Sequence, residues 1–202
     1  MSRAARLIAG FVLTAAIAGC SILGPRPERS NFLVLTPVSA DGNSSAAAAG
    51  QTPLAVGLGP VSLPNYLDRP EVVMRSSENT LALSSTDRWA EPLADNFRNV
   101  FEADLTTSLG NSRIVRYPWF ANARPDYAVR VEVEQFEVSA ADGAILKAHW
   151  SINNPKDGST LVSRQADITQ PMNSHDPQAI AAALSAALGD LSRQIAQALR
   201  GL

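Results

Sequence analysis

The alternating pattern of residues 127–139 limits the fold more than any other feature of this 202-residue chain. Apolar residues alternate with charged ones here: Val129, Val131 and Val133 with Arg130, Glu132 and Glu134. A period of two predicts a β-strand with one face toward a core and the other toward solvent. After Val133 the apolar positions are Phe136 and Val138, so the phase shifts by one residue near Gln135. We expect a β-bulge at this point.

Two strands and a helix are expected after this strand. Residues 144–153 and 160–168 have the composition of strands, and residues 154–158 predict the turn that joins them in a meander. Asp176 and Pro177 then predict the N-cap and the first position of a helix. Its apolar residues recur three or four apart: Ile180, Leu184, Leu188, Leu191, Ile195 and Leu199. Many other positions are alanine, which permits close approach to a sheet or to a neighbouring subunit.

An earlier stretch shows the same helical period. Its apolar positions are Trp89, Leu93, Phe97, Val100, Phe101, Leu105 and Leu109. This stripe predicts an amphipathic helix from Trp89 onward, with Pro92 in its first turn. Asp87 or Glu91 is the expected N-cap, and residues 110–111 (Gly-Asn) predict the C-terminal end.

Short β-rich segments complete the expected sheet: 31–36, 54–61, 71–76, 80–84 and 114–117. Residues 37–53, rich in Ala, Ser and Gly, predict a mobile loop. Two long helices on one side of a largely antiparallel sheet make an α+β, two-layer domain. Residues 31–202 suffice for one such domain with a core and are too few for two.

The first 20 residues have the organisation of a bacterial lipoprotein signal peptide. Two basic residues, Arg3 and Arg6, come before an apolar run at residues 7–17. Two small residues, Ala18 and Gly19, then precede Cys20, the only cysteine of the sequence. We expect residues 1–19 to be removed and Cys20 to carry a diacylglyceryl group on its sulfur and an acyl chain, such as palmitate, on its new N-terminus. An ordinary secretory signal that happens to contain a cysteine is the alternative. Each buried methylene contributes about 0.8 kcal/mol, so such an anchor would be permanent.

The residues after the cysteine predict the location of the mature chain. Ser21 stands where an aspartate would signal retention in the inner membrane, which favours the periplasmic face of the outer membrane of a Gram-negative cell. Residues 20–30 predict a flexible spacer. Loss of Arg3 and Arg6 takes Lys plus Arg from 17 to 15 against 19 acidic residues, a mature net charge of −4. This charge does not indicate a nucleic-acid partner.

Hydrolytic chemistry needs a nucleophile with a base, a carboxylate pair in a cleft or a metal cluster, and the two histidines of the sequence offer little toward any of these. His149 in a predicted strand and His175 before the last helix belong to no metal-ligand spacing and have no cysteine to help them. We therefore expect no enzymatic activity, no metal and no cofactor other than the covalent lipid on Cys20. An envelope hydrolase is the lowest-ranked alternative.

Three short motifs carry a family resemblance. They are residues 61–70 (Val-Ser-Leu-Pro-Asn-Tyr-Leu-Asp-Arg-Pro), 72–75 (Val-Val-Met-Arg) and 88–93 (Arg-Trp-Ala-Glu-Pro-Leu). Together with the lipoprotein signal, these motifs and their order along the chain resemble those of the PqiC-like family, the ABC-type transport auxiliary lipoproteins. The resemblance runs from Cys20 to the last helix. Around Ser44 to Gly50 the chain departs from the family in an Ala-rich insert.

The resemblance implies an accessory subunit of an intermembrane lipid transport system. Its partner would be a mammalian-cell-entry (MCE) domain protein and, through it, an inner-membrane permease and ATPase. It is also compatible with a homo-oligomeric ring that matches the symmetry of the partner. The alternative is a lipoprotein that assists another envelope machine, such as lipopolysaccharide insertion, or that binds peptidoglycan. Phe97, Phe101 and Leu105 fit a filled core and a lipid tunnel equally well.

The loop before residue 71 is the candidate partner interface: Leu63, Pro64, Tyr66, Leu67, Arg69 and Pro70. A turn that presents Tyr, Leu and Arg has the composition of interface hot spots. Alternatively, Tyr66 and Leu67 fold back onto the sheet and Arg69 pairs with an acid. Trp89 joins the candidates, although an indole at such a boundary more often covers a core than serves as a platform for a ligand.

Overall fold

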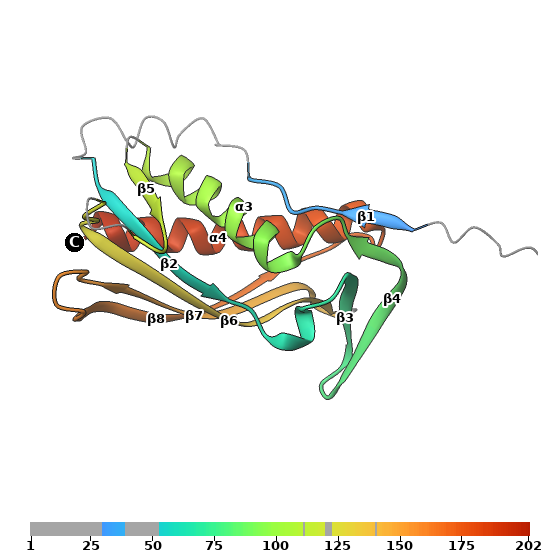
Figure 1. Ribbon diagram of the computed structural model, residues 1–202. Helices are drawn as coiled ribbons and strands as arrows, with labels where there is room; N and C mark the ends of the chain where they lie inside the picture. Colours follow the sequence, from blue (N-terminus) through green and yellow to red (C-terminus); the bar gives the residue numbers. More distant parts are fainter. Residues whose placement is uncertain (1–29, 39–52, 111, 120–122, 140) are drawn as a thin grey trace, which may run out of the picture.

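The computed structural model describes residues 30–38, 53–110, 112–119, 123–139 and 141–202. The predicted signal peptide, Cys20 and almost all of the spacer lie outside these residues, as does most of the predicted loop 37–53. In the described part, eight strands form one sheet, and two α-helices lie on one side of it (Figure 1). None of the helices described is both long and apolar enough to cross a membrane.

The sheet is organised around its longest strand, β6. The strands are β1 (Asn31–Leu33), β2 (Ala55–Ser62), β3 (Glu71–Ser77), β4 (Thr80–Trp89), β5 (Arg113–Arg116), β6 (Tyr127–Ser139), β7 (Gly143–Asn153) and β8 (Thr160–Gln170). Strand β7 pairs antiparallel with β6 along nearly its whole length, and β8 pairs antiparallel with β7. The other edge of β6 is shared between β2, at residues 127–132, and β3, at residues 138–139. From there one branch continues through β4 to β1 and the other to β5.

Helices α3 (Leu93–Leu109) and α4 (Pro177–Arg200) cover one face of the sheet and pack against each other (Figure 1). The largest fully buried side chains of the core are Trp150, Phe97, Phe101 and Phe136. The α+β, two-layer fold is therefore confirmed, and its longest pairings are antiparallel. The sequence did not predict that β1 pairs with β4, β2 with β5 and β6, and β3 with β6 in parallel.

The β-bulge predicted in β6 is present. The pairing of β6 with β7 shifts its register between Val133 and Gln135. The extra residue turns the following apolar side chains back toward the helices. Phe136 thus meets Phe97 of α3 edge to face, with ring centroids 5.1 Å apart.

The start of α3 differs from the prediction. Strand β4 continues to Trp89, and the helix begins at Leu93, so Pro92 is the N-cap residue rather than part of the first turn. No side chain caps this end, and the expected N-cap role of Asp87 or Glu91 is wrong. Asp87 instead accepts a hydrogen bond from Ser84, and Glu91 accepts one from Asn96. At the other end Gly110, with φ of 62°, is the C-cap, as predicted.

The start of α4 agrees with the prediction. A carboxylate oxygen of Asp176 accepts a hydrogen bond from the Ala179 amide at 2.8 Å, and Pro177 is the first helical residue. Farther along, Gly189 leaves room for the side chain of Val38 against the helix. A Cβ at position 189 would lie 2.4 Å from Cγ2 of Val38.

The chain that follows β1 is held by polar side chains from both helices. The Leu35 amide donates to Oδ1 of Asn96 at 2.6 Å, the Thr36 amide to Oγ of Ser185 at 3.1 Å, and the Val38 amide to Oδ1 of Asp104 at 2.8 Å. These bonds satisfy backbone groups that have no strand partner. Residues 34–38 are therefore fixed to α3 and α4 together.

Candidate functional site

Two of the sequence motifs meet in one cleft. Residues 68–70, at the end of the loop between β2 and β3, form one wall, and residues 89–93 form the other. The cleft has a volume of about 360 Å³. The Trp89 amide donates to the Pro70 carbonyl at 2.7 Å, and Arg88 pairs with Glu71 at 2.8 Å. These two contacts join the walls.

The loop between β2 and β3 folds onto the sheet. Its centre is a short 3₁₀ turn, η2 (Asn65–Leu67), in which the Leu67 amide donates to the Pro64 carbonyl at 2.9 Å. Leu67 is only 3% exposed and belongs to the core. The hydroxyl of Tyr66 donates a hydrogen bond to the Glu137 carboxylate of β6. The loop thus has a fixed inner side and an exposed outer side.

Glu137 is the charged centre of this arrangement. Its side chain is completely buried, and its Oε1 accepts from Nε of Arg75 at 2.6 Å and lies 2.5 Å from Nη2. Oε2 accepts from Tyr66, so the loop, β3 and β6 converge on one carboxylate. Burial of Tyr66, followed by its hydrogen bond to Glu137, holds the pKa of the phenol well above its usual range. Tyr66 therefore stays a hydrogen-bond donor at physiological pH.

The candidate interface residues divide into three groups. Leu67 and Trp89 are buried, while Leu63, Pro64 and Tyr66 are half-buried. Arg69 and Pro70 are exposed and line the cleft. Arg69 forms no ion pair with any residue in the described part of the chain. Of the predicted set, the structure brings Arg69, Pro70 and Trp89 together around one cavity.

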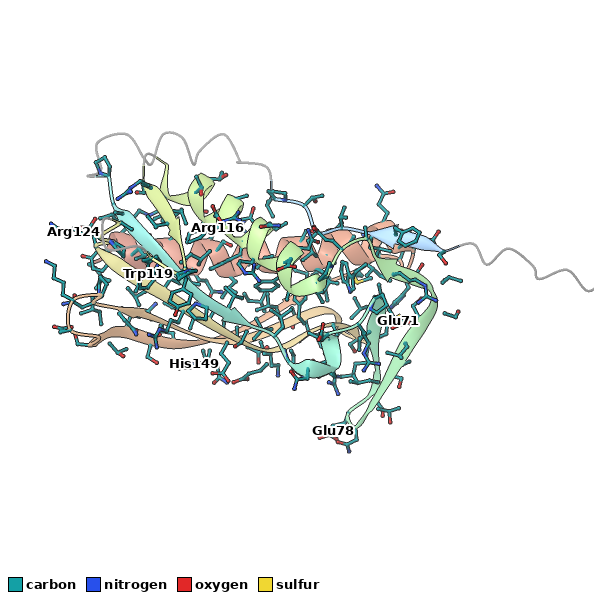
Figure 2. The ribbon with its side chains drawn as sticks, viewed as in Figure 1. Glu71, Glu78, Arg116, Trp119, Arg124 and His149 are labelled. Carbon is teal, nitrogen blue, oxygen red and sulfur yellow. The ribbon has the colours of Figure 1, made fainter. Side chains whose placement is uncertain are left out.

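Sequence reasoning missed the roles of four further residues: Glu137, Arg75, Leu81 and Leu83. Arg75 ends one of the three motifs and Glu137 lies in the alternating strand, but neither segment reveals that the two side chains meet the distant Tyr66 loop. The hairpin of β3 and β4 projects from the sheet (Figure 1) and carries Leu81 and Leu83, which are 37% and 48% exposed. In Figure 2, Glu71 and Glu78 mark this hairpin, with Glu78 at its tip. The sequence places both leucines in the strand predicted from 80 to 84, but it does not show that they are exposed.

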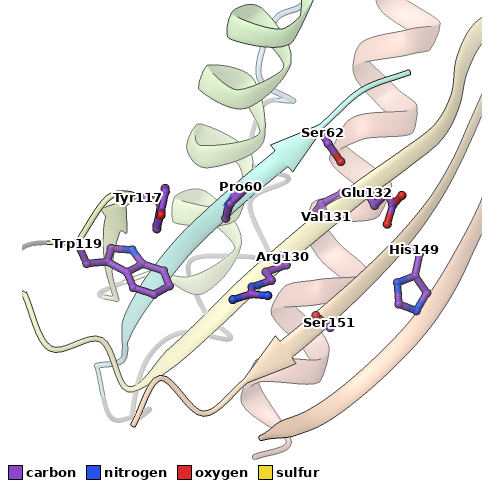
Figure 3. Close-up of a pocket in the computed structure, with 9 residues that line it drawn as sticks. All are labelled: Pro60, Ser62, Tyr117, Trp119, Arg130, Val131, Glu132, His149 and Ser151. Atoms are coloured by element: carbon purple, nitrogen blue, oxygen red, sulfur yellow. The ribbon is translucent and has the colours of Figure 1, made fainter. Parts of the chain in front are cut away.

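A second pocket, of about 400 Å³, lies on the strands of the sheet and contains one of the two histidines. Figure 3 shows Arg130 of β6 and His149 of β7 on neighbouring strands, with Trp119 and Tyr117 at the border. Nε2 of His149 lies 2.9 Å from Oγ of Ser163, a polar partner on β8. His175 lies before α4 and does not line this pocket. Among the described residues, no three His, Cys, Asp or Glu side chains are grouped to hold a metal ion.

Comparison with known proteins shows what kind of protein this is. Residues 34–196 match the sequence pattern of the family described as ABC-type transport auxiliary lipoprotein component. The chain belongs to this family. The family contains auxiliary lipoproteins of transport systems, and it is not a family of enzymes. The resemblance found in the three motifs is therefore confirmed.

The curated relatives agree with this assignment, and a solved structure shares the fold. The chain is 28% identical over 138 residues to the intermembrane transport lipoprotein PqiC of Escherichia coli K12, covering 68% of this chain and 69% of the relative. The protein of that name from Shigella flexneri gives the same values. The crystal structure of XCC0632 from Xanthomonas campestris has a TM-score of 0.65 at 20% identity and covers 85% of this chain and 93% of its own. That structure supports the fold alone.

Proposed function

We propose that the protein is anchored to the periplasmic face of the outer membrane and docks the MCE-domain subunit of an intermembrane lipid transport system. Through that subunit it would act with an inner-membrane permease and ATPase. The observation that carries the proposal is the cleft between residues 68–70 and 89–93, because two motifs of the resemblance form its walls. The covalent lipid on Cys20 would be the only non-protein group.

The chemistry of the cleft suits a protein partner. Arg69 presents an exposed guanidinium, which can bind a carboxylate through two parallel hydrogen bonds. Leu81 and Leu83 add exposed apolar surface on the neighbouring hairpin. The bonds from Tyr66 and Arg75 to Glu137 fix the loop before any partner arrives. A preorganised loop loses little conformational entropy on binding.

The core supports docking rather than carriage of lipid inside the domain. Phe97, Phe101 and Leu105 were equally compatible with a core and with a tunnel. All three have no exposed surface and belong to one packed cluster with β6 and α4. A lipid tunnel lined by these side chains would leave part of their surface accessible to a water-sized probe.

Site-specific crosslinking in cells tests the docking proposal. A photoreactive amino acid replaces Arg69 in the cleft. As a control, it replaces Lys156 in the turn between β7 and β8, which lies at the end of the sheet away from β3 and β4 (Figure 1). Crosslinked products are identified by mass spectrometry. We expect an MCE-domain protein at position 69 and none at position 156.

The other outcomes of this experiment lead elsewhere. A β-barrel protein or cell-wall fragments at position 69 would support lipopolysaccharide insertion or peptidoglycan binding instead. Equal yields of the MCE protein at positions 69 and 156 would exclude the cleft as the docking site. The homo-oligomeric ring stays a prediction, and the mass of the lipidated protein in native mass spectrometry tests it.

A further inference from the structure

Strand β1 and the residue after it present two large apolar side chains to solvent. Phe32 is 68% exposed and Val34 is 44% exposed, whereas Leu33 and Leu35 are buried. This alternation follows from the extended backbone, which points successive side chains in opposite directions. A single exposed apolar residue needs no explanation, but adjacent ones that border a groove indicate a contact surface.

Such a groove lies between β1 and the first turns of α4, with a volume of about 470 Å³. Its walls are Phe32, Leu33, Val34 and Thr36 on one side and Pro177, Gln178, Ala181 and Ala182 on the other. These lining residues include no charged side chain. An uncharged and mainly apolar groove favours a lipid surface over a charged partner.

The place of this surface in the chain indicates what covers it. Phe32 follows Cys20 by 12 residues in the sequence. Fully extended, that length of chain reaches at most about 40 Å. Strand β1 is the first element of the described domain, so it is the element closest along the chain to the anchoring residue.

We propose that this surface, residues 32–36 with the first turns of α4, lies against the membrane that holds the anchor, with Phe32 in the interfacial layer of the lipids. The proposal rests on the lipid anchor of the proposed function. A tether keeps the domain at a high local concentration beside the bilayer, so a contact too weak to bind alone is sufficient. Phe32 is aligned with Arg88 of β4, and the ion pair of Arg88 with Glu71 offsets this charge. The contact is therefore apolar and insensitive to salt.

This orientation also places the cleft. Leu33 pairs with Trp89, and the Ala90 amide donates to the Leu33 carbonyl at 2.9 Å. Trp89 and Ala90 line the cleft. A partner that enters the cleft thus approaches the end of the domain that faces the membrane.

Labelling of a single cysteine tests the membrane contact on the full-length lipidated protein. Cys20 is the only cysteine of the chain and is consumed by lipid, so Phe32→Cys provides a unique site for an environment-sensitive dye. The control is Leu161→Cys in β8, an apolar residue that is 44% exposed. Both proteins are reconstituted into phospholipid vesicles, and flotation verifies the anchor. We expect a blue shift of the dye at position 32, with quenching by brominated lipids and no effect of salt. At position 161 we expect a water-like spectrum.

Three results would overturn the inference. A water-like spectrum at position 32 in protein that floats with the vesicles refutes the membrane contact and leaves the anchor intact. Failure of both labelled proteins to float removes the anchor and, with it, both proposals. A blue shift at position 32 that persists without vesicles, in Cys20→Ser protein, shows that a second copy of the chain covers Phe32.

Discussion

Replacing Glu137 by glutamine shows how strongly the buried carboxylate holds the loop between β2 and β3. The substitution keeps the size of the side chain but removes the charge opposite Arg75, whose Nη2 lies 2.5 Å from Oε1. Loss of one partner from a buried ion pair leaves the other charge uncompensated and costs about 3–5 kcal/mol. The Arg75 side chain is 20% exposed, so water solvates part of it. We therefore expect the free energy of unfolding to fall by about 2–3 kcal/mol.

Urea unfolding of the Cys20→Ser protein measures this loss. Tryptophan fluorescence reports it, because Trp89 and Trp150 are only 6% and 1% exposed. The matched control is Glu71→Gln, which breaks a pair with Arg88 whose side chains are 29% and 27% exposed. Ion pairs that water reaches from the surface contribute at most about 1 kcal/mol. If the variants of Glu137 and Glu71 lose equal stability, the reasoning about the buried carboxylate is refuted.

A second variant separates the loop from the ion pair. Tyr66→Phe removes only the hydrogen bond to Glu137, which is a bond to a charged group and is worth about 1.5–3 kcal/mol. In combination with Glu137→Gln, its effect should be smaller than in the wild type, because both substitutions disrupt the same cluster. Additive losses would show that Tyr66 and Glu137 do not act together. In cells, both single variants should reduce the crosslink at Arg69.

Three further predictions concern the packing around the helices. Burial raises the pKa of Asp104 from its ordinary value of 3.8 to about 6. The folded protein thus binds this proton more tightly than the unfolded chain does. The free energy of unfolding should therefore fall as the pH rises from 4 to 6, by up to about 1.4 kcal/mol per pH unit. Asp104→Asn should remove this pH dependence, which urea titrations at several pH values measure. Helix propensity alone predicts that Gly189→Ala stabilises α4 by about 1 kcal/mol, but the clash with Val38 should cancel the gain unless Val38→Ala is added. Asp176→Ala should lower the melting temperature through loss of an N-cap worth about 1 kcal/mol, without changing the crosslink at Arg69.

The features predicted correctly from the sequence are those with local signals. The bulge near Gln135 appears as a phase shift within one strand, and the start of α4 appears as an Asp-Pro pair before an apolar stripe. The start of α3 was misplaced because Trp89 stands four residues before Leu93 and fits the helical period. Pairing of β4 with β1 and β3 extends the strand to Trp89. Nothing in the neighbouring residues reveals this long-range pairing.

The candidate site was only partly accessible to sequence reasoning for the same reason. The motifs located both walls of the cleft, but composition could not say which side chains face outward. Leu67 faces the core, whereas Arg69, two residues later, is exposed. Glu137 lies 71 residues from Tyr66 and 62 from Arg75. A cluster built from three distant segments has no pattern in any one of them.

In the proposed orientation, β1 would connect the membrane to the cleft. Leu33 pairs with the strand that ends at Trp89, and residues 34–38 are bonded to both helices, so β1 is fixed to the rest of the described domain. A longer spacer before residue 30 would let the domain move farther from the bilayer but would leave the cleft unchanged. Phe32→Ser would leave the length of the spacer unchanged but would remove the membrane contact that orients the domain. If docking depends on orientation, crosslinking at Arg69 should fall with Phe32→Ser and persist with a modestly longer spacer. The reverse pattern would mean that distance from the membrane controls docking.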